Sequence, residues 1–258
     1  MTNASSRWRH PWWLGGLIAV IVMLGWVVPA GASTVNPYPT GSSGYDVGYP
    51  NCSETPPGGF AIVGLGSGRP FKTNRCLASE WATAKGFGGT PTPALYFNTG
   101  YSGAYARDIT SPCTKYAGPS VTGFPKHDQS TYMKAWEIGC SEAAYAATIA
   151  KTNNEDPSMW WADIETGNSW STNQTVNQYA VDGISYEMQQ STPGVAGVYS
   201  YTAAWNKIVG PGFTATPPFA GDWGPGLSCA TTGFSGAPVW ILQGGTTSSG
   251  VDTDTGCG

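Results

Sequence analysis

The sequence predicts an α/β protein whose strands close into a β/α barrel. Eight short segments have the composition of strands, and most are continuous apolar runs, which is typical of strands covered on both faces. Helical patterns separate the early strands and then vanish after about residue 210, where the connections are rich in Gly, Pro, Ser and Thr. Alternating strands and helices imply right-handed crossovers and a parallel sheet, and eight strands are enough to close it.

The expected elements alternate along the first part of the chain. The expected strands are Gly44–Tyr49, Phe60–Leu65, Pro93–Asn98, Met159–Glu165, Val195–Tyr201, Pro218–Trp223, Val239–Gln243 and Val251–Asp254. The expected helices are Cys76–Lys85, Ser130–Lys151, Thr175–Gln190 and Thr202–Val209, of which Thr175–Gln190 has the clearest amphipathic pattern. An open doubly wound sheet is the main rival to a TIM-type barrel. It would normally carry a phosphate-binding glycine turn, but the glycines of residues 64–68 have the wrong spacing and lead into Arg69-Pro70 instead of a helix.

The N-terminus has the pattern of an export signal. Arg7, Arg9 and His10 form a basic start, Trp12–Val28 is apolar, and Pro29–Ala32 supplies the small residues that a signal peptidase recognises. We expect residues 1–32 to be a signal peptide that is cleaved after Ala32. The apolar segment approaches the length of a spanning helix, so an uncleaved anchor is the alternative, and the Ala-Gly-Ala ending favours release.

The rest of the chain suits one large domain. Residues 33–43 are polar and rich in Gly and Pro, and we expect them to form a flexible mature N-terminus ahead of a barrel over residues 44–258. All 16 acidic residues but only 10 of the 12 basic ones follow residue 32, which gives this part a formal net charge of −6. Nucleic acid and anionic membrane surfaces are therefore poor partners. The low share of charged residues and the many Gly and Pro residues are typical of a loop-rich extracellular protein.

All six cysteines follow the signal segment, and an even number in an exported chain indicates three disulfides. The cysteines are Cys52, Cys76, Cys113, Cys140, Cys229 and Cys257. Sequence alone leaves their connectivity open; we expect neighbours in sequence to pair, because each pair would tie a loop to its adjoining element. No two cysteines have Cys-x-x-Cys spacing and His127 is the only histidine after residue 32, so we expect no metal and no cofactor.

An apolar, aromatic run, Met159–Glu165, ends in two carboxylates separated by one residue. Side chains alternate along a strand, so Asp163 and Glu165 would share one face with Cα atoms about 6.6 Å apart. Burying unpaired carboxylates costs several kcal/mol, which favours a functional site over a core position. The alternative is that the strand simply ends there and water solvates both acids in the following loop.

Other acids fall where a barrel would bring them to the same mouth. Asp46 lies in the first expected strand, and Asp252 and Asp254 lie in the eighth. The first and eighth strands are neighbours in a closed barrel, so Asp46 and Asp252 would line one side of the mouth. Asp163 and Glu165 would line the other side, at the strand ends where β/α barrels place their chemistry.

Aromatic residues and one further acid accompany these carboxylates near strand ends. We expect them to bind substrate: Tyr96, Tyr199, Tyr201, Trp223 and Asp222. Carboxylates beside aromatic rings suit glycoside hydrolysis, in which one acid protonates the leaving oxygen, another stabilises the cationic transition state, and rings stack on sugar faces. Trp160, Trp161 and Trp240 are expected in the core instead.

Several of these segments resemble glycoside hydrolase family 25 lysozymes. Gly44-Tyr45-Asp46-Val47 resembles the opening strand of that family, Asp163-Ile164-Glu165 its acid-x-acid strand, and Gly250-Val251-Asp252 its closing strand. Further segments occur in the family's order, namely Gly197–Tyr201, Ala220–Trp223 and Pro238–Gln243. The resemblance covers nearly all of residues 44–258 and is closest to the secreted glycoside-hydrolase-like barrels of actinobacteria related to the family.

This resemblance implies a (β/α)5β3 barrel, in agreement with the loss of helices after the fifth strand. It implies that Glu165 is the general acid and that Asp163 orients the substrate N-acetyl group or stabilises charge. Asp46 and Asp252 would be supporting carboxylates. The chain departs from the family pattern at three places: Gly48 replaces a serine, the third-strand Tyr-His-aromatic element reads Leu95-Tyr96-Phe97, and a Trp-Gln pair becomes Trp240 and Gln243.

We therefore expect a secreted or cell-wall-associated glycosidase with muramidase-like activity on peptidoglycan. We expect it to be a monomer without stable membrane association once the signal is removed. One alternative is a glycan-binding barrel of the cell envelope that keeps the acidic groove without useful catalysis. Another is a purely structural envelope protein.

Overall fold

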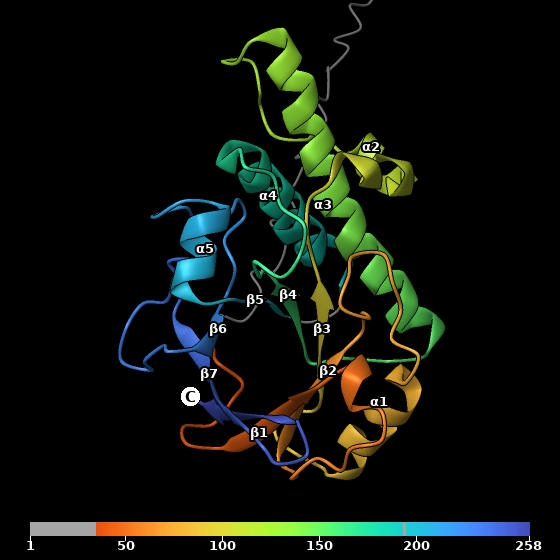
Figure 1. The fold of residues 1–258 in the computed structure, drawn as a ribbon, viewed down its shortest axis with the longest axis vertical. Coiled ribbons are helices and arrows are strands. Elements are labelled where there is room, and N and C mark those ends of the chain that lie inside the picture. Colours follow the sequence, from red (N-terminus) through yellow and green to blue (C-terminus); the bar gives the residue numbers. More distant parts are fainter. Residues whose placement is uncertain (1–34, 193–194) are drawn as a thin grey trace, which may run out of the picture. The chain divides into compact units, whose positions relative to one another are not determined.

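Eight strands form one closed barrel in the computed structural model, which describes residues 35–192 and 195–258 (Figure 1). In order around the barrel they are β1 (Ser43–Val47), β2 (Phe60–Gly64), β3 (Ala94–Asn98), β4 (Met159–Asp163), β5 (Val195–Tyr199), β6 (Asp222–Pro225), β7 (Val239–Thr246) and β8 (Asp252–Gly256). The predicted α/β barrel is confirmed. The sixth strand begins later than expected, at Asp222, although Ala220 and Gly221 already hydrogen-bond to β5.

The direction of the last strand differs from the expected parallel sheet. Strands β1 to β7 are parallel to their neighbours in sequence, whereas β8 is antiparallel to both β7 and β1. Only residues 247–251 separate β7 from β8, and so short a connection can reverse the chain but cannot cross over it. Reversal places Asp252, the first residue of β8, directly opposite Asp46 in β1. Asp252 therefore lies at the end of the barrel where the other strands finish.

Helices cover the barrel between the early strands. They are α1 (Leu77–Gly86), α2 (Ser111–Lys115), α3 (Lys126–Thr152), α4 (Gln174–Ser191) and α5 (Thr202–Ile208), with short 3-10 helices η1 (Tyr49–Asn51) and η2 (Gly103–Asp108). The four expected helices are present, while α2 and the 3-10 helices were not predicted. In the described chain no helix follows α5, so loops join β6, β7 and β8, as a (β/α)5β3 arrangement requires. The crossover from β1 to β2 is reduced to η1.

Successive side chains of the strands face two different cores. Trp161 of β4 points into the barrel with Trp223 and Trp240, whereas its neighbour Trp160 packs in the layer between the barrel and the helices. Each of these rings is at most 2% exposed. Burial on both faces explains why the strands are continuous apolar runs, and it confirms the core positions expected for Trp160, Trp161 and Trp240.

The segment ahead of β1 closes the far end of the barrel. Tyr38 is fully buried; its ring lies 4.8 Å from that of Phe60, and its hydroxyl accepts a hydrogen bond of 3.2 Å from Trp161 Nε1. Its backbone carbonyl accepts a hydrogen bond from Gly258 N at 2.8 Å. The prediction of a flexible segment over residues 33–43 is therefore wrong from about Tyr38 onward, because a composition rich in Gly and Pro does not reveal that one tyrosine fills the barrel.

The three disulfides pair cysteines that are neighbours in sequence, as expected. They join Cys52 to Cys76, Cys113 to Cys140, and Cys229 to Cys257. The last of these ties the loop after β6 to the residue that follows β8. None of the helices in residues 35–192 and 195–258 has the length and hydrophobicity needed to cross a membrane. The expected signal peptide, residues 1–32, lies outside the described residues.

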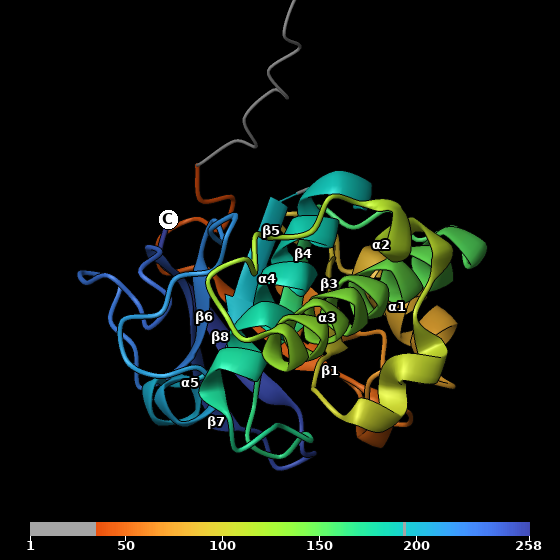
Figure 2. The ribbon, with the colours of Figure 1, turned by 90° about the horizontal axis from the view of Figure 1, so that it is seen from above.

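Helices α3 and α4 lie side by side on the outside of the barrel (Figure 2). Two glycines permit this close approach. A Cβ atom on Gly139 of α3 would overlap the carbonyl of Ala180, and one on Gly183 of α4 would overlap the carbonyl of Trp136. The obstacle in both cases is helix backbone, which cannot rotate away as a flexible side chain could.

We expect Gly183→Ala to lower the free energy of unfolding by about 1–3 kcal/mol, because the added methyl group forces the two helices apart. Urea denaturation of the purified protein measures this change. The matched control is Gly86→Ala at the end of α1, where a Cβ meets no atom within 4 Å and the expected change is below about 1 kcal/mol. Equal effects of the two substitutions would contradict the packing role of Gly183.

Candidate active site

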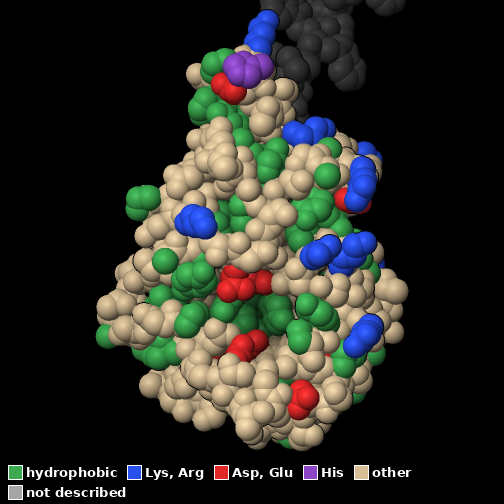
Figure 3. Space-filling model, viewed as in Figure 1, with side chains coloured by type: hydrophobic (Ala, Val, Ile, Leu, Met, Phe, Trp, Pro, Cys, Tyr) green, Lys and Arg blue, Asp and Glu red, His purple; other side chains and the backbone are tan. Residues whose placement is uncertain are grey.

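Carboxyl groups from β1, β8 and the end of β4 gather in the barrel, at its mouth and, for Asp254, in the buried interior beneath it. They belong to Asp46, Asp163, Glu165, Asp252 and Asp254, and electrostatic interactions couple each of them to others of the group. Figure 3 shows a hollow with acidic side chains on opposite sides and hydrophobic side chains between them, while Lys and Arg side chains lie outside it. We call these five residues the carboxyl group cluster.

Asp163 is held in place by the neighbouring strand. It is the last residue of β4, lies opposite Asn98 of β3 and is only 4% exposed. Asn98 Nδ2 donates to Asp163 Oδ2 at 2.5 Å, and Asn98 Oδ1 in turn accepts from the backbone N–H of Gly68 at 2.9 Å. The Gly68 N–H fixes which end of the Asn98 amide is the acceptor, so the other end must donate to Asp163.

Asp163 and Glu165 interact through their carboxyl groups, as their shared strand face predicts. Burial raises the pKa of Asp163 well above its usual range, and the Glu165 charge and the hydrogen bond to Glu165 raise it further. Asp163 Oδ2 accepts from Asn98, whereas the buried Oδ1 has no hydrogen-bond partner among the described residues. Burial also raises the pKa of Glu165, against the opposing effect of its hydrogen bond with Asp163. Burial thus favours the protonated form of both carboxyl groups.

The side-chain amide of Gln243 links Asp46 to Tyr199 by two hydrogen bonds. Gln243 of β7 donates from Nε2 to Asp46 Oδ2 at 3.1 Å, and its Oε1 accepts from the Tyr199 hydroxyl at 2.7 Å. Burial raises the pKa of Asp46 to about 7, with a further contribution from the Asp252 charge and an opposing one from Gln243. Asp252 accepts a hydrogen bond of 2.5 Å from the Thr246 hydroxyl.

Beneath these groups, Trp223 forms a floor. Trp223 is 2% exposed, and its Nε1 donates to Asp254 Oδ1 at 2.8 Å. Its ring centroid lies 4.4 Å from that of Tyr199 and 6.2 Å from that of Tyr96. Trp223 thus supports the site from inside the barrel and offers no exposed face to a sugar, unlike the substrate platform expected from its place near a strand end.

Solved structures show the same architecture. A bacterial lysozyme from Streptomyces coelicolor matches with a TM-score of 0.53 and 14% identity, over 85% of this chain and 93% of that one. A family GH25 lysozyme from Aspergillus fumigatus matches with a TM-score of 0.53 and 13% identity, over 85% and 95% of the two chains. The fold is that of a family GH25 lysozyme. A muramidase from Acremonium alcalophilum has the same TM-score of 0.53 at 14% identity, over 84% and 93% of the chains. No protein-family model and no curated protein matches the sequence, so this GH25 likeness is one of fold.

Two departures from the GH25 sequence pattern compensate for each other. A Cβ atom on Gly48 would overlap the Tyr96 hydroxyl, and one on Gly64 would lie 2.6 Å from the Tyr96 ring. Tyr96 therefore fills the space that the missing side chains leave, and its hydroxyl is directed toward the carboxyl group cluster. The charges of Asp46 and Asp163 add to burial in raising the pKa of Tyr96 well above its usual range, so the phenol stays protonated.

The structure does not bring every predicted residue into the mouth of this GH25-like barrel. Asp222 is fully buried on the outward side, where it accepts hydrogen bonds from the Ser235 hydroxyl at 2.5 Å and the Ser235 N–H at 2.9 Å. It orders the loop before β7 and cannot reach a substrate. Tyr201 lies at the rim, where its hydroxyl is 3.2 Å from that of Thr166.

Three residues of the site were not predicted from the sequence as site residues: Asp254, Asn98 and Gln243. Asp254 follows Asp252 by two positions in a strand and so shares its face, which was a usable signal. Asn98 is a polar residue at the end of an apolar strand, a weaker signal of the same kind. Gln243 gave no signal, because the sequence does not show that β7 brings it between Asp46 and Tyr199.

No three carboxyl groups of the cluster lie close enough together in the described residues to form a metal-type grouping. In residues 35–192 and 195–258, the groupings of metal-type side chains are Cys52 with Cys76 and Glu80, and Cys113 with Cys140 and Glu187. Both contain a disulfide, whose sulfurs are not thiolates and cannot bind a metal as thiolates do.

We expect Asp46→Asn to flatten the pH dependence of stability. An acid whose pKa rises from 3.8 in the unfolded chain to about 7 in the folded one stabilises the protein fully below about pH 4 and loses that contribution as the pH rises through about 7. In the variant, the slope of the unfolding free energy against pH should become smaller by an amount that corresponds to up to about one bound proton. Urea denaturation at a series of pH values measures it, and an unchanged m-value shows that both proteins unfold from the same state. Identical slopes would contradict the raised pKa.

Proposed function

We propose that this protein is a secreted glycoside hydrolase with muramidase-like activity on the glycan of peptidoglycan, and that Glu165 is its general acid. The observation that carries the proposal is the pair of interacting, partly desolvated carboxyl groups at the mouth of a GH25-like barrel. The solved structures with this fold are described as lysozymes and muramidases. Three disulfides support an extracellular location.

Glu165 is better placed than Asp163 to deliver a proton. It is half-buried and follows β4, whereas Asp163 is 4% exposed and bound to Asn98. Burial raises the pKa of Glu165 above its usual range, the hydrogen bond with Asp163 opposes this, and the Asp252 charge adds to it, so the protonated form is favoured more than in an ordinary glutamate. A general acid needs a protonated state and access to the leaving oxygen, and Glu165 combines the two.

The opposite side of the mouth supplies negative charge. In the proposed reaction the Glu165 proton passes to the glycosidic oxygen as its bond to the anomeric carbon breaks, which leaves positive charge on the sugar. Asp46 and Asp252, which lie opposite each other in β1 and β8, place their carboxyl groups on the side of the mouth that faces this charge. Water then adds to the anomeric carbon and gives up a proton that returns to the Glu165 carboxylate, which restores the enzyme.

We expect Glu165→Gln to lower kcat/KM on purified peptidoglycan by at least about 100-fold, because glutamine fills the same space without a transferable proton. Release of reducing ends, with mass spectrometry of the products, measures the change. Glu54→Gln, at an exposed position outside the cluster, is the matched control and should leave the activity unchanged.

Thermal unfolding of both variants shows whether a loss of activity comes from a lost catalytic group or from an unfolded protein. Carboxyl groups in proteins titrate over roughly pH 3 to pH 8. If the wild-type protein releases no product anywhere in this range, the proposed hydrolase activity is refuted. Binding of peptidoglycan without product would instead favour the alternative, a glycan-binding barrel of the cell envelope.

We expect Asp252→Asn to move the alkaline limb of the activity profile to lower pH. The Asp252 charge raises the pKa of Glu165, so its removal lets Glu165 lose its proton earlier as the pH rises. Asparagine keeps an oxygen that can accept from the Thr246 hydroxyl. Measurement of kcat/KM against pH for the two proteins tests this, and a limb that stays in place or moves to higher pH would contradict the assignment of Glu165 as the acid.

A further inference from the structure

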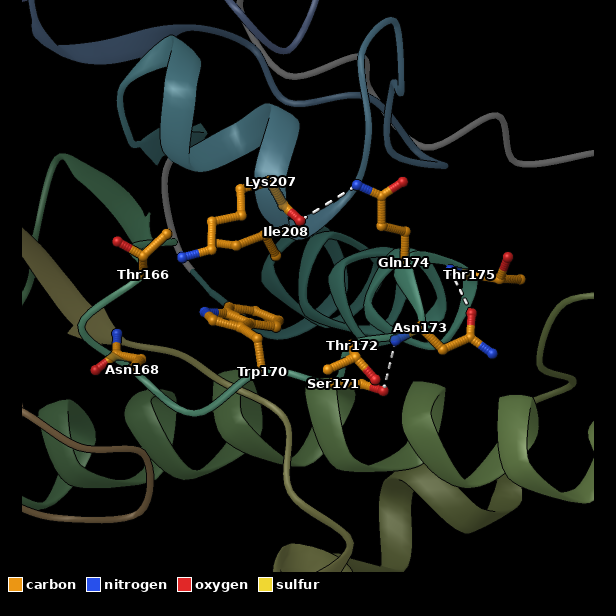
Figure 4. A pocket seen from close by; sticks show the side chains of 10 residues that line it. All are labelled: Thr166, Asn168, Trp170, Ser171, Thr172, Asn173, Gln174, Thr175, Lys207 and Ile208. Atoms are coloured by element: carbon orange, nitrogen blue, oxygen red, sulfur yellow. Dashed lines mark hydrogen bonds between the residues drawn. The ribbon is translucent and has the colours of Figure 1, made fainter.

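The residues that carry the acids on the β4 side of the mouth are held by groups that can only donate a hydrogen bond. The backbone carbonyl of Glu165 accepts at 2.9 Å from Nε1 of Trp170, which lines a pocket of ≈ 690 Å³ between the loop after β4 and α5 (Figure 4). Asp163 accepts from Asn98, and the backbone N–H of Gly68 fixes the orientation of the Asn98 amide. Because an indole N–H and a backbone N–H cannot accept, neither arrangement can be reversed.

Asp46, on the β1 side of the mouth, is held differently. Its Oδ2 accepts at 3.1 Å from Nε2 of Gln243, and the other end of that amide, Oε1, accepts at 2.7 Å from the Tyr199 hydroxyl. A hydroxyl can donate or accept, so the orientation of the Gln243 amide depends on where the Tyr199 proton points. In the reversed orientation Gln243 Oε1 would face Asp46 Oδ2, and this oxygen would have to carry a proton.

The Tyr199 hydroxyl keeps its proton and has one acceptor for it. Burial raises the pKa of Tyr199 far above its usual range, and the charges of Glu165 and Asp163 raise it further. Among the described residues, Gln243 is the one hydrogen-bond partner of this hydroxyl. Reversal of the amide would bring an N–H group against the hydroxyl and leave the phenol proton without an acceptor among these residues, which is unfavourable in a partly desolvated site.

Packing holds the Tyr199 ring where this hydrogen bond requires it. Tyr199 is the last residue of β5 and lies opposite Asp163 of β4 and Trp223 of β6. The ring centroids of Tyr199 and Trp223 are 4.4 Å apart, and Trp223 is itself held by its 2.8 Å hydrogen bond to Asp254. The Tyr199 ring therefore cannot turn away from Gln243 without losing its contact with a buried indole.

These contacts give Tyr199 a role that acts through Gln243. We infer that Tyr199 is a positioning residue: its hydroxyl holds the Gln243 amide with the N–H end on Asp46, so that Asp46 Oδ2 remains a hydrogen-bond acceptor. A proton that Asp46 takes up then resides on its other oxygen, Oδ1. The inference rests on the proposed function in one respect, that Asp46 lies on the side of the mouth facing the reacting sugar. The arrangement of the three side chains needs no substrate.

Ionisable groups from several strands face Asp46 and take part in its titration. They are Asp252 and Asp254 of β8, Asp163 and Glu165 at the end of β4, Tyr96 of β3 and Tyr199 of β5. Burial and then the charges of Asp252 and Glu165 raise the pKa of Asp46, whereas the hydrogen bond from Gln243 lowers it. Tyr199 is uncharged, and variants of Tyr199 and Gln243 leave the other groups in place. A change in the pKa of Asp46 between such variants therefore reports on the amide.

The test is a double-mutant cycle in which the pKa of Asp46 is measured. Carbon-13 NMR of the aspartate carboxyl carbons follows the titration, and the signal that is lost in Asp46→Asn identifies this residue. Tyr199→Phe keeps the ring against Trp223 and should raise the pKa of Asp46 by about 1, because the freed amide can turn its oxygen toward Asp46. Gln243→Met, which has a similar length and no amide, should raise the pKa by a similar amount. In protein that already carries Gln243→Met, Tyr199→Phe should change the pKa by less than about 0.3.

Tyr105→Phe, in η2 and outside the carboxyl group cluster, is the matched control for loss of a phenol hydroxyl and should leave the pKa of Asp46 unchanged. An unchanged or lowered pKa in Tyr199→Phe or in Gln243→Met overturns the inference. So does an equal rise from Tyr199→Phe with and without the Gln243 amide, because Tyr199 would then act on Asp46 directly. The titration requires no turnover, so the expected shifts support the role of Tyr199 even if the wild-type protein releases no product from peptidoglycan.

Discussion

The mouth of the barrel must accommodate five carboxyl groups without a positive charge to neutralise them. None of the ion pairs in the described part of the chain involves Asp46, Asp163, Glu165, Asp252 or Asp254. Ionised carboxylates in a partly desolvated site repel one another, so the stable arrangement keeps several of them protonated. Burial raises the pKa values of Asp46, Asp163 and Asp254, and the charges of neighbouring carboxylates raise them further. Burial and the Asp252 charge also raise the pKa of Glu165.

Uncharged donors carry out the task that cations perform in other buried acid clusters. Asn98 donates to Asp163, Gln243 to Asp46, and Trp223 to Asp254. Asn98 and Gln243 are themselves held by the Gly68 N–H and the Tyr199 hydroxyl. These hydrogen bonds orient the acids and lower their pKa values, but the effect of burial is larger, so the pKa values stay raised.

The sequence by itself determined the barrel, because the alternation of apolar strands and amphipathic helices is a local property that burial on both faces imposes on every strand. It also determined the pairing of Asp163 with Glu165, since a period of two fixes which residues share a face. Tertiary structure alone decided that β8 is reversed and thereby aligns Asp252 with Asp46, that Tyr38 seals the barrel, and that Asp222 and Trp223 support the fold instead of facing a substrate. These outcomes depend on contacts between residues far apart in the chain, such as Gln243 with Asp46 and Tyr38 with Trp161, and no local pattern records them.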